Sequence, residues 1–172
     1  MSRQLPLIVD AHKLAKQGAT LDGILLLSRL SRISDLLAAD DGQITINLQF
    51  EVGDDHLHYV RGHMTGEIRV LCQRCMEPIV TAVDNKFVLG IMDNPEIAKR
   101  LPEEIDPVYV DQGELLVFDM IEDELILSLP LIAMHDIQDC SATEHMQDTG
   151  FDKELKEQEK RDNPFAILKD LK

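Results

Sequence analysis

Two cysteines separated by two residues, Cys72 and Cys75, are the side chains of this sequence best suited to metal chemistry. They stand in the segment Leu-Cys-Gln-Arg-Cys-Met-Glu-Pro, residues 71–78. Thiolates at this spacing can bind one zinc ion from a single turn. A structural zinc site needs about four nitrogen or sulfur ligands, so the rest of the chain must supply the others.

The remaining ligands are predicted to be His135 and Cys140. Cys140 is the only other cysteine, and the chain then reads C-x2-C and H-x4-C, with about sixty residues between the halves. Each half has the spacing of a zinc ligand pair. Two alternatives stay open at this point. The first is that His56, His58 or His63 supplies ligands in place of His135 and Cys140. The second is that the three thiols are reduced, partly buried and without metal.

Thiol redox catalysis is a weaker interpretation of the same cysteines. A redox-active C-x-x-C lies at a helix N-terminus, where the dipole lowers the thiol pKa, whereas here Met-Glu-Pro and a strand pattern follow. Arg74 could still favour a thiolate through its charge. The sequence contains no G-x-G-x-x-G, no P-loop and no G-x-S-x-G. We therefore predict a protein that is not an enzyme.

The cysteine pair is predicted to lie at the tip of a β-hairpin. Apolar and polar residues alternate over residues 43–52, and residues 57–71 and 79–92 are further strand-like stretches with short connections. Consecutive strands with short connections form an antiparallel meander most simply. The alternation shifts phase near Tyr59, and Gly62 follows, which predicts a bulge or a bend.

Shorter elements surround this meander. Residues 5–9 and 108–110 are strand-like, and Asp10 can cap a short helix through Gln17. Apolar residues at helical spacing predict helices over residues 27–38 and 117–129, the second ended by Pro130. The predicted fold class is therefore α+β: an antiparallel sheet with a few packed helices and a partly disordered acidic C-terminal tail.

The charge of the chain is strongly negative and unevenly distributed. The net charge is −15, and residues 101–143 contain 11 Asp and Glu but no Lys or Arg. Such a surface repels phosphates and suits a basic protein partner, and Glu122 and Asp123 are its predicted contact residues. One alternative is that the acidity only maintains solubility. Another is binding of structured RNA through a local basic patch of Lys13, Lys16, Arg29 and Arg32.

The C-terminal residues differ in composition from the rest. We predict a domain over residues 1–140 and a charged linker over 141–172 that ends in a short amphipathic helix. Asn163-Pro164 has the pattern of an N-cap followed by proline, and Phe165, Leu168 and Leu171 form an apolar stripe. This stripe is predicted to dock, either on a partner or on the chain's own domain.

The N-terminus lacks the long apolar stretch of a signal peptide, and the longest uncharged apolar run, residues 125–134, is short for a bilayer. An odd number of cysteines without an export signal favours reduced thiols. These observations predict a cytoplasmic protein that does not contact a membrane.

Four segments, in order, resemble the bacterial YceD family, the large ribosomal RNA subunit accumulation proteins. Cys72-Gln-Arg-Cys75 resembles its C-x-R-C, and residues 122–130 resemble its E-D-E-x-x-L-x-L-P. His135 and Cys140 match a later histidine and cysteine region, and residues 163–172 are similar to its N-P-F-A-x-L ending. The resemblance implies a non-enzymatic cytoplasmic factor needed for accumulation of the large-subunit (23S) ribosomal RNA. It also implies a two-part metal site, although some relatives have more cysteines in the second half.

Overall fold

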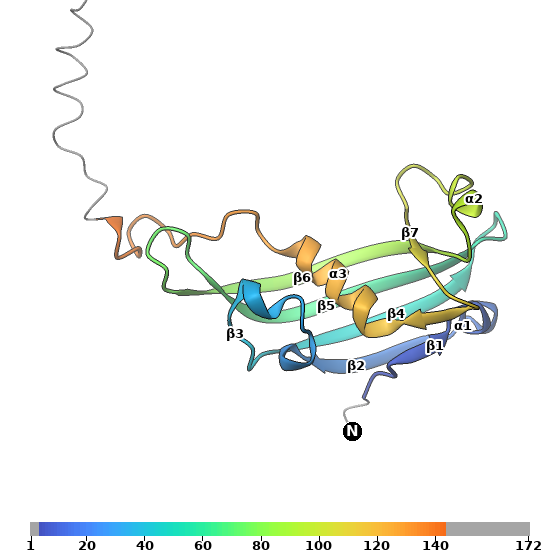
Figure 1. The fold of residues 1–172 in the computed structure, drawn as a ribbon, viewed down its shortest axis with the longest axis horizontal. Coiled ribbons are helices and arrows are strands. Elements are labelled where there is room, and N and C mark those ends of the chain that lie inside the picture. Colours follow the sequence, from blue (N-terminus) through green and yellow to red (C-terminus); the bar gives the residue numbers. More distant parts are fainter. Residues whose placement is uncertain (1–3, 144–172) are drawn as a thin grey trace, which may run out of the picture. The chain divides into compact units, whose positions relative to one another are not determined.

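The computed structural model describes residues 4–143. The chain divides into two compact units, and the boundary between them falls after Met134. The first unit is built on a six-stranded sheet (Figure 1). Its strands are β2 (Thr20–Leu26), β3 (Leu37–Ala39), β4 (Gln43–Val52), β5 (His58–Leu71), β6 (Pro78–Met92) and β7 (Asp106–Tyr109).

The centre of the sheet confirms the predicted antiparallel meander. The order is β2-β4-β5-β6-β7, and β3 pairs with β5 off this path. Every neighbouring pair is antiparallel except β6 and β7, which are parallel. The parallel edge strand was not predicted, because a stretch as short as Val108–Val110 carries no signal of its direction.

One face of the sheet is buried, as the alternation in β4 predicts. Ile44, Ile46, Leu48 and Phe50 are fully buried, while the residues between them are exposed or half-buried. The predicted bulge in β5 is wrong, because β5 pairs with β6 in unbroken register along its whole length. Gly62 is needed for a different reason: a Cβ there would come within 2.0 Å of the Phe87 ring.

The elements packed on the buried face come from both ends of the first unit. They are β1 (Ile8–Asp10), α1 (Ala11–Gln17), β8 (Glu114–Leu116) and α3 (Val117–Ser128). Strands β1 and β8 form a second, antiparallel sheet. Helix α3 crosses the large sheet in Figure 1, and its Ile121 and Leu125 are fully buried in the core cluster. The predicted cap is confirmed, since Asp10 accepts a hydrogen bond from the backbone N–H of Lys13 at 2.8 Å.

The helix predicted over residues 27–38 is wrong. The segment forms two single turns of 3-10 helix, η1 (Leu27–Arg29) and η2 (Ser34–Leu36), followed by β3. In an α-helix the N–H groups of Arg32 and Ile33 would donate to the carbonyls four residues earlier. Here they donate to the carboxylate of Glu122. Leu27, Leu30 and Ile33 are buried, so the apolar spacing marks core residues without specifying a helix.

The remaining helix, α2 (Pro95–Ala98), is capped by Asn94, whose side chain accepts hydrogen bonds from the N–H groups of Glu96 and Ile97. None of the helices in residues 4–143 has the length and apolar character needed to cross a bilayer. The predicted docking residues Phe165, Leu168 and Leu171, and most of the predicted linker, lie outside the described residues.

Candidate metal centre

The turn between β5 and β6 carries the C-x-x-C pair at the tip of the hairpin, as predicted. Leu71 and Pro78 are the last paired residues of the two strands. The Cys72 N–H donates to the Glu77 carbonyl at 2.9 Å, and the Met76 N–H donates to the Cys72 carbonyl at 2.8 Å. Met76 has φ 61°, the left-handed conformation that reverses the chain. The backbone thus fixes a tight loop containing both thiols.

A second part of the first unit runs beside this turn. The Gln73 N–H donates to the carbonyl of Ala133 at 2.9 Å, and its side-chain amide lies 3.4 Å from the carbonyl of Leu131. The segment after α3 is therefore anchored to the loop that carries the two cysteines. His135 follows Ala133 by two residues in the sequence.

The four predicted ligands lie close together. The Sγ atoms of Cys72, Cys75 and Cys140 and a ring nitrogen of His135 are all within 4.8 Å of one another. Cys72 and Cys140 are buried, and Cys75 and His135 are half-buried. Within the described part of the chain no other set of three or more such side chains meets this criterion. His56, His58 and His63, the alternative ligands, are not part of the group.

The donor set fits a structural zinc ion. Three thiolates and one imidazole are a common structural combination, and tetrahedral geometry with bonds of about 2.3 Å puts the donors roughly 3.8 Å apart. The observed separations, up to 4.8 Å, need only small inward movements of side chains to reach this geometry. A buried set of donors that fills four positions leaves none for a substrate.

The surroundings of the cysteines differ from those of a redox dithiol. The C-x-x-C turn is followed directly by β6, so neither of its cysteines lies in the first turn of a helix, where a redox-active C-x-x-C is placed. The geometry favours metal binding over thiol exchange.

Comparison with known proteins identifies the family of the chain. Residues 60–172 match the family model described as large ribosomal RNA subunit accumulation protein YceD. The chain belongs to the YceD family. A protein from Haemophilus influenzae called large ribosomal RNA subunit accumulation protein YceD is 33% identical over 172 residues, which cover 98% of this chain and 97% of that protein. No solved structure matches.

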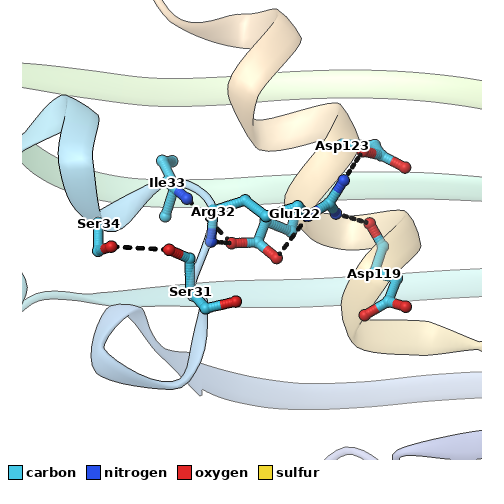
Figure 2. Close-up of polar contacts among 7 residues, drawn as sticks. All are labelled: Ser31, Arg32, Ile33, Ser34, Asp119, Glu122 and Asp123. Atoms are coloured by element: carbon cyan, nitrogen blue, oxygen red, sulfur yellow. Dashed lines mark hydrogen bonds and ion pairs between the residues drawn. The ribbon is translucent and has the colours of Figure 1, made fainter.

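In this YceD-family chain the acidic motif at residues 122–124 has a structural role that the sequence did not reveal. Figure 2 shows the Glu122 carboxylate reaching from α3 to the loop at residues 31–34. Its Oε1 accepts hydrogen bonds from the N–H groups of Arg32 at 2.6 Å and Ile33 at 3.0 Å, and its Oε2 lies 3.1 Å from the Arg32 Nε. Only 4% of Glu122 is exposed. The loop without a regular helix is thus held by one buried carboxylate.

The expectation that Glu122 is exposed is therefore wrong, and its predicted role as a partner contact stays a prediction. Its position off the apolar stripe of α3 indicated a solvated side chain, but the loop carrying Arg32 covers it. Asp123 remains exposed, although Arg32 Nη1 is paired with it (Figure 2). Together the two carboxylates raise the pKa of Arg32, first through the hydrogen bond that Arg32 donates to Asp123 and then through the one that it donates to Glu122. Of the two carboxylates, that of Asp123 is the more accessible.

The basic patch proposed for RNA is also partly engaged within the protein. Arg32 is bonded to Glu122, to Asp123 and to the backbone carbonyl of Asp119. The guanidinium of Arg29 lies 4.6 Å above the ring of Phe118. Two of the four basic residues of the patch, Arg29 and Arg32, are therefore in contact with α3. The other two, Lys13 and Lys16, are exposed on α1. The structure therefore provides less support for RNA binding at this patch than the sequence does.

A histidine pair was missed by the sequence analysis. His12 of α1 and His58 of β5 face each other with Nδ1 atoms 2.5 Å apart, and His12 Nε2 lies 2.9 Å from Asp93 after β6. Burial lowers the pKa of His58 most, and the charges of His12 and Lys16 lower it further. The charge of Asp93 raises this pKa and so acts in the opposite direction. Two histidines 46 residues apart carry no sequence signal of such contact.

This pair predicts a loss of stability in mild acid. Because the pKa of His58 is lower in the folded state than its usual value of about 6.5, the unfolded chain binds more protons below that pH. The free energy of unfolding should therefore fall as the pH drops from 7.5 to 5.5. Denaturant titrations at several pH values should show a shallower fall for His58→Gln. The control is His63→Gln, at an exposed histidine paired with Asp84. In this variant the free energy of unfolding should fall with pH as steeply as in the wild type. Identical slopes in wild type and His58→Gln would refute the assignment.

Proposed function

We propose that this protein is a non-enzymatic factor in biogenesis of the large ribosomal subunit, needed for accumulation of the 23S ribosomal RNA. The observation that carries the proposal is the family match, together with a named relative that aligns along nearly the whole chain. As a factor for ribosome assembly, the protein acts in the cytoplasm. It binds a basic protein of the large subunit, or an assembly factor, and contacts RNA only weakly or indirectly.

We infer that the role of the metal site is structural. Zinc held by Cys72, Cys75, His135 and Cys140 would fix the tip of the hairpin, and it would supply no open coordination position for a reaction. The mutual distances of the four donors, and the burial of Cys72 and Cys140, support this ligand set. The metal thus stabilises a surface for binding and takes no part in chemistry.

The charge distribution supports a protein partner. Residues 101–143 contain no Lys or Arg, and affinity for an RNA backbone depends on such cations. Arg29 and Arg32 are already engaged with α3. A basic ribosomal protein gains attraction from the same acidic surface that repels RNA.

Capture from cells tests the partner. The chain, tagged and expressed at its native level, should retain basic large-subunit proteins after nuclease treatment, while ribosomal RNA is lost. Deleting the gene that encodes the chain should lower the cellular ratio of large-subunit to small-subunit ribosomal RNA. Reintroducing the wild-type gene should restore this ratio. Loss of capture after nuclease treatment would indicate direct RNA binding. So would an affinity for ribosomal RNA whose logarithm falls by about one unit per phosphate contact for each tenfold rise in salt.

A further inference from the structure

A groove runs between the edge strand β7 and the segment formed by β8 and α3. It comprises two adjoining hollows of about 520 and 360 Å³, which share Pro107, Val108, Met120 and Asp123. All of its lining residues belong to the first compact unit.

The groove combines exposed apolar side chains with carboxylates. Tyr109, Leu116 and Leu127 line it and are 54%, 48% and 76% exposed. Six acidic residues line the two hollows, and no Lys or Arg does: Asp106, Asp111, Glu114, Asp119, Asp123 and Glu124. An apolar surface flanked mainly by carboxylates complements a ligand that presents both apolar and basic groups to it.

Crowding of these carboxylates is visible at Glu124. Its pKa is raised above the usual value by burial first and then by the charges of Asp106 and Asp123. Among the groove carboxylates, Asp123 has the Arg32 guanidinium beside it. A cation brought by a ligand would relieve this repulsion, so the free groove favours a basic occupant.

One wall of the groove also offers backbone hydrogen-bonding groups. Strand β7 is the last strand of its sheet, and no described strand pairs with its outer edge. The Val110 N–H donates to the Met92 carbonyl of β6, so by the alternation of a strand the N–H and C=O of Tyr109 point away from β6. By the same alternation Pro107 offers only its carbonyl, and the backbone N–H and C=O of Asp111 are bonded to Glu114, so a strand added from another chain can pair at Tyr109 and at the Pro107 carbonyl.

We propose that the groove binds an extended basic segment of a protein partner, which lies along β7 with alternate side chains directed into the groove. Its apolar residues cover Tyr109 and Leu116, and its Lys or Arg residues reach Asp111, Asp119 and Asp123. The inference rests on the proposed function for the basic nature of the partner, and it adds the place and the mode of binding.

Synthetic peptides test the binding mode. The probe is a fluorescent ten-residue peptide in which every second residue is Lys or Val by turns and the residues between are Ser, so that Lys and Val lie on the same face of the extended chain. It is titrated against the full chain and followed by anisotropy. We expect saturable binding that weakens with salt. The same peptide with N-methyl groups on alternate amides, which keeps the charge but blocks strand pairing, should bind at least about tenfold more weakly. Equal affinity for both peptides would overturn strand addition, and a Glu-for-Lys peptide that binds equally well would overturn the basic specificity.

Matched variants locate the site. Asp111→Asn with Asp119→Asn removes two groove carboxylates that are exposed, and should weaken the peptide by about tenfold. Asp35→Asn with Asp54→Asn makes the same charge change at exposed positions outside the groove, and should alter affinity by less than about twofold. Equal losses in both double variants would overturn the groove as the site.

Capture from cells separates this inference from the proposed function. If the groove variant retains the nuclease-resistant basic partner at wild-type level, the groove inference fails and the proposed function stands. If no basic protein is captured by wild type, the proposed function fails, and the peptide result alone then decides whether the groove binds basic segments. Loss of the partner from the groove variant, with retention by the control variant, supports both.

Discussion

Replacing Glu122 with alanine is expected to lower the free energy of unfolding by about 2–4 kcal/mol, because each buried donor left without an acceptor costs about 1–3 kcal/mol. The carboxylate accepts the N–H groups of both Arg32 and Ile33, and Ile33 is fully buried. Water cannot replace the lost acceptor at Ile33 without opening the loop. Urea titration followed by circular dichroism measures the change directly.

The neighbouring residue provides the control. Asp123→Ala removes a carboxylate from the same helix and the same arginine, but its side chain is 58% exposed. An exposed pair of this kind contributes at most about 1 kcal/mol. Glu122→Gln keeps the shape and one acceptor oxygen, and should fall between the two. If Glu122→Ala and Asp123→Ala destabilise equally and by less than about 1 kcal/mol, the buried network has no structural role.

Removing zinc is the second change with a large expected effect. If the site is loaded at free zinc about 1,000 times its dissociation constant, the metal stabilises the folded chain by about 4 kcal/mol. At about 2–4 °C per kcal/mol, chelation should lower the melting temperature by roughly 10 °C. Calorimetry with and without chelator measures the shift, and elemental analysis of protein purified without chelator should give one zinc per chain.

Single substitutions test each ligand. Cys72→Ser and Cys140→Ser should each abolish stoichiometric zinc and lower the melting temperature to that of the chelated protein. His63→Gln alters a histidine outside the ligand group and should leave the zinc content unchanged. Full zinc occupancy in Cys140→Ser would exclude that residue as a ligand. A chain that contains no zinc and melts at the same temperature with and without chelator would refute the metal proposal.

The meander and the cysteine turn could be predicted from sequence because their signals are local. Alternation over residues 43–52 is dictated by one buried face, and two cysteines in one turn must lie together. The segment at residues 27–38 could not be predicted, because its amide groups are satisfied by Glu122, 90 residues away. The same long-range contact explains why Glu122 was expected to be exposed. The spacing of apolar residues along α3 indicates which face of the helix packs on the sheet. It contains no information about a loop that covers another face.

The pairing between the two ends of the first unit has a consequence for synthesis on the ribosome. Ile8 of β1 pairs with Leu116 of β8, and the Arg32 N–H donates to the carboxylate of Glu122. The β4-β5-β6 meander contains only neighbouring strands, so it can form as soon as it emerges. The N-terminal strand and the loop after β2, although made first, cannot reach their final partners until α3 has left the exit tunnel. A nascent chain that has exposed only the residues before 114 outside the tunnel should therefore leave both segments open to proteolysis, and protection should appear once α3, through Ser128, has also left the tunnel.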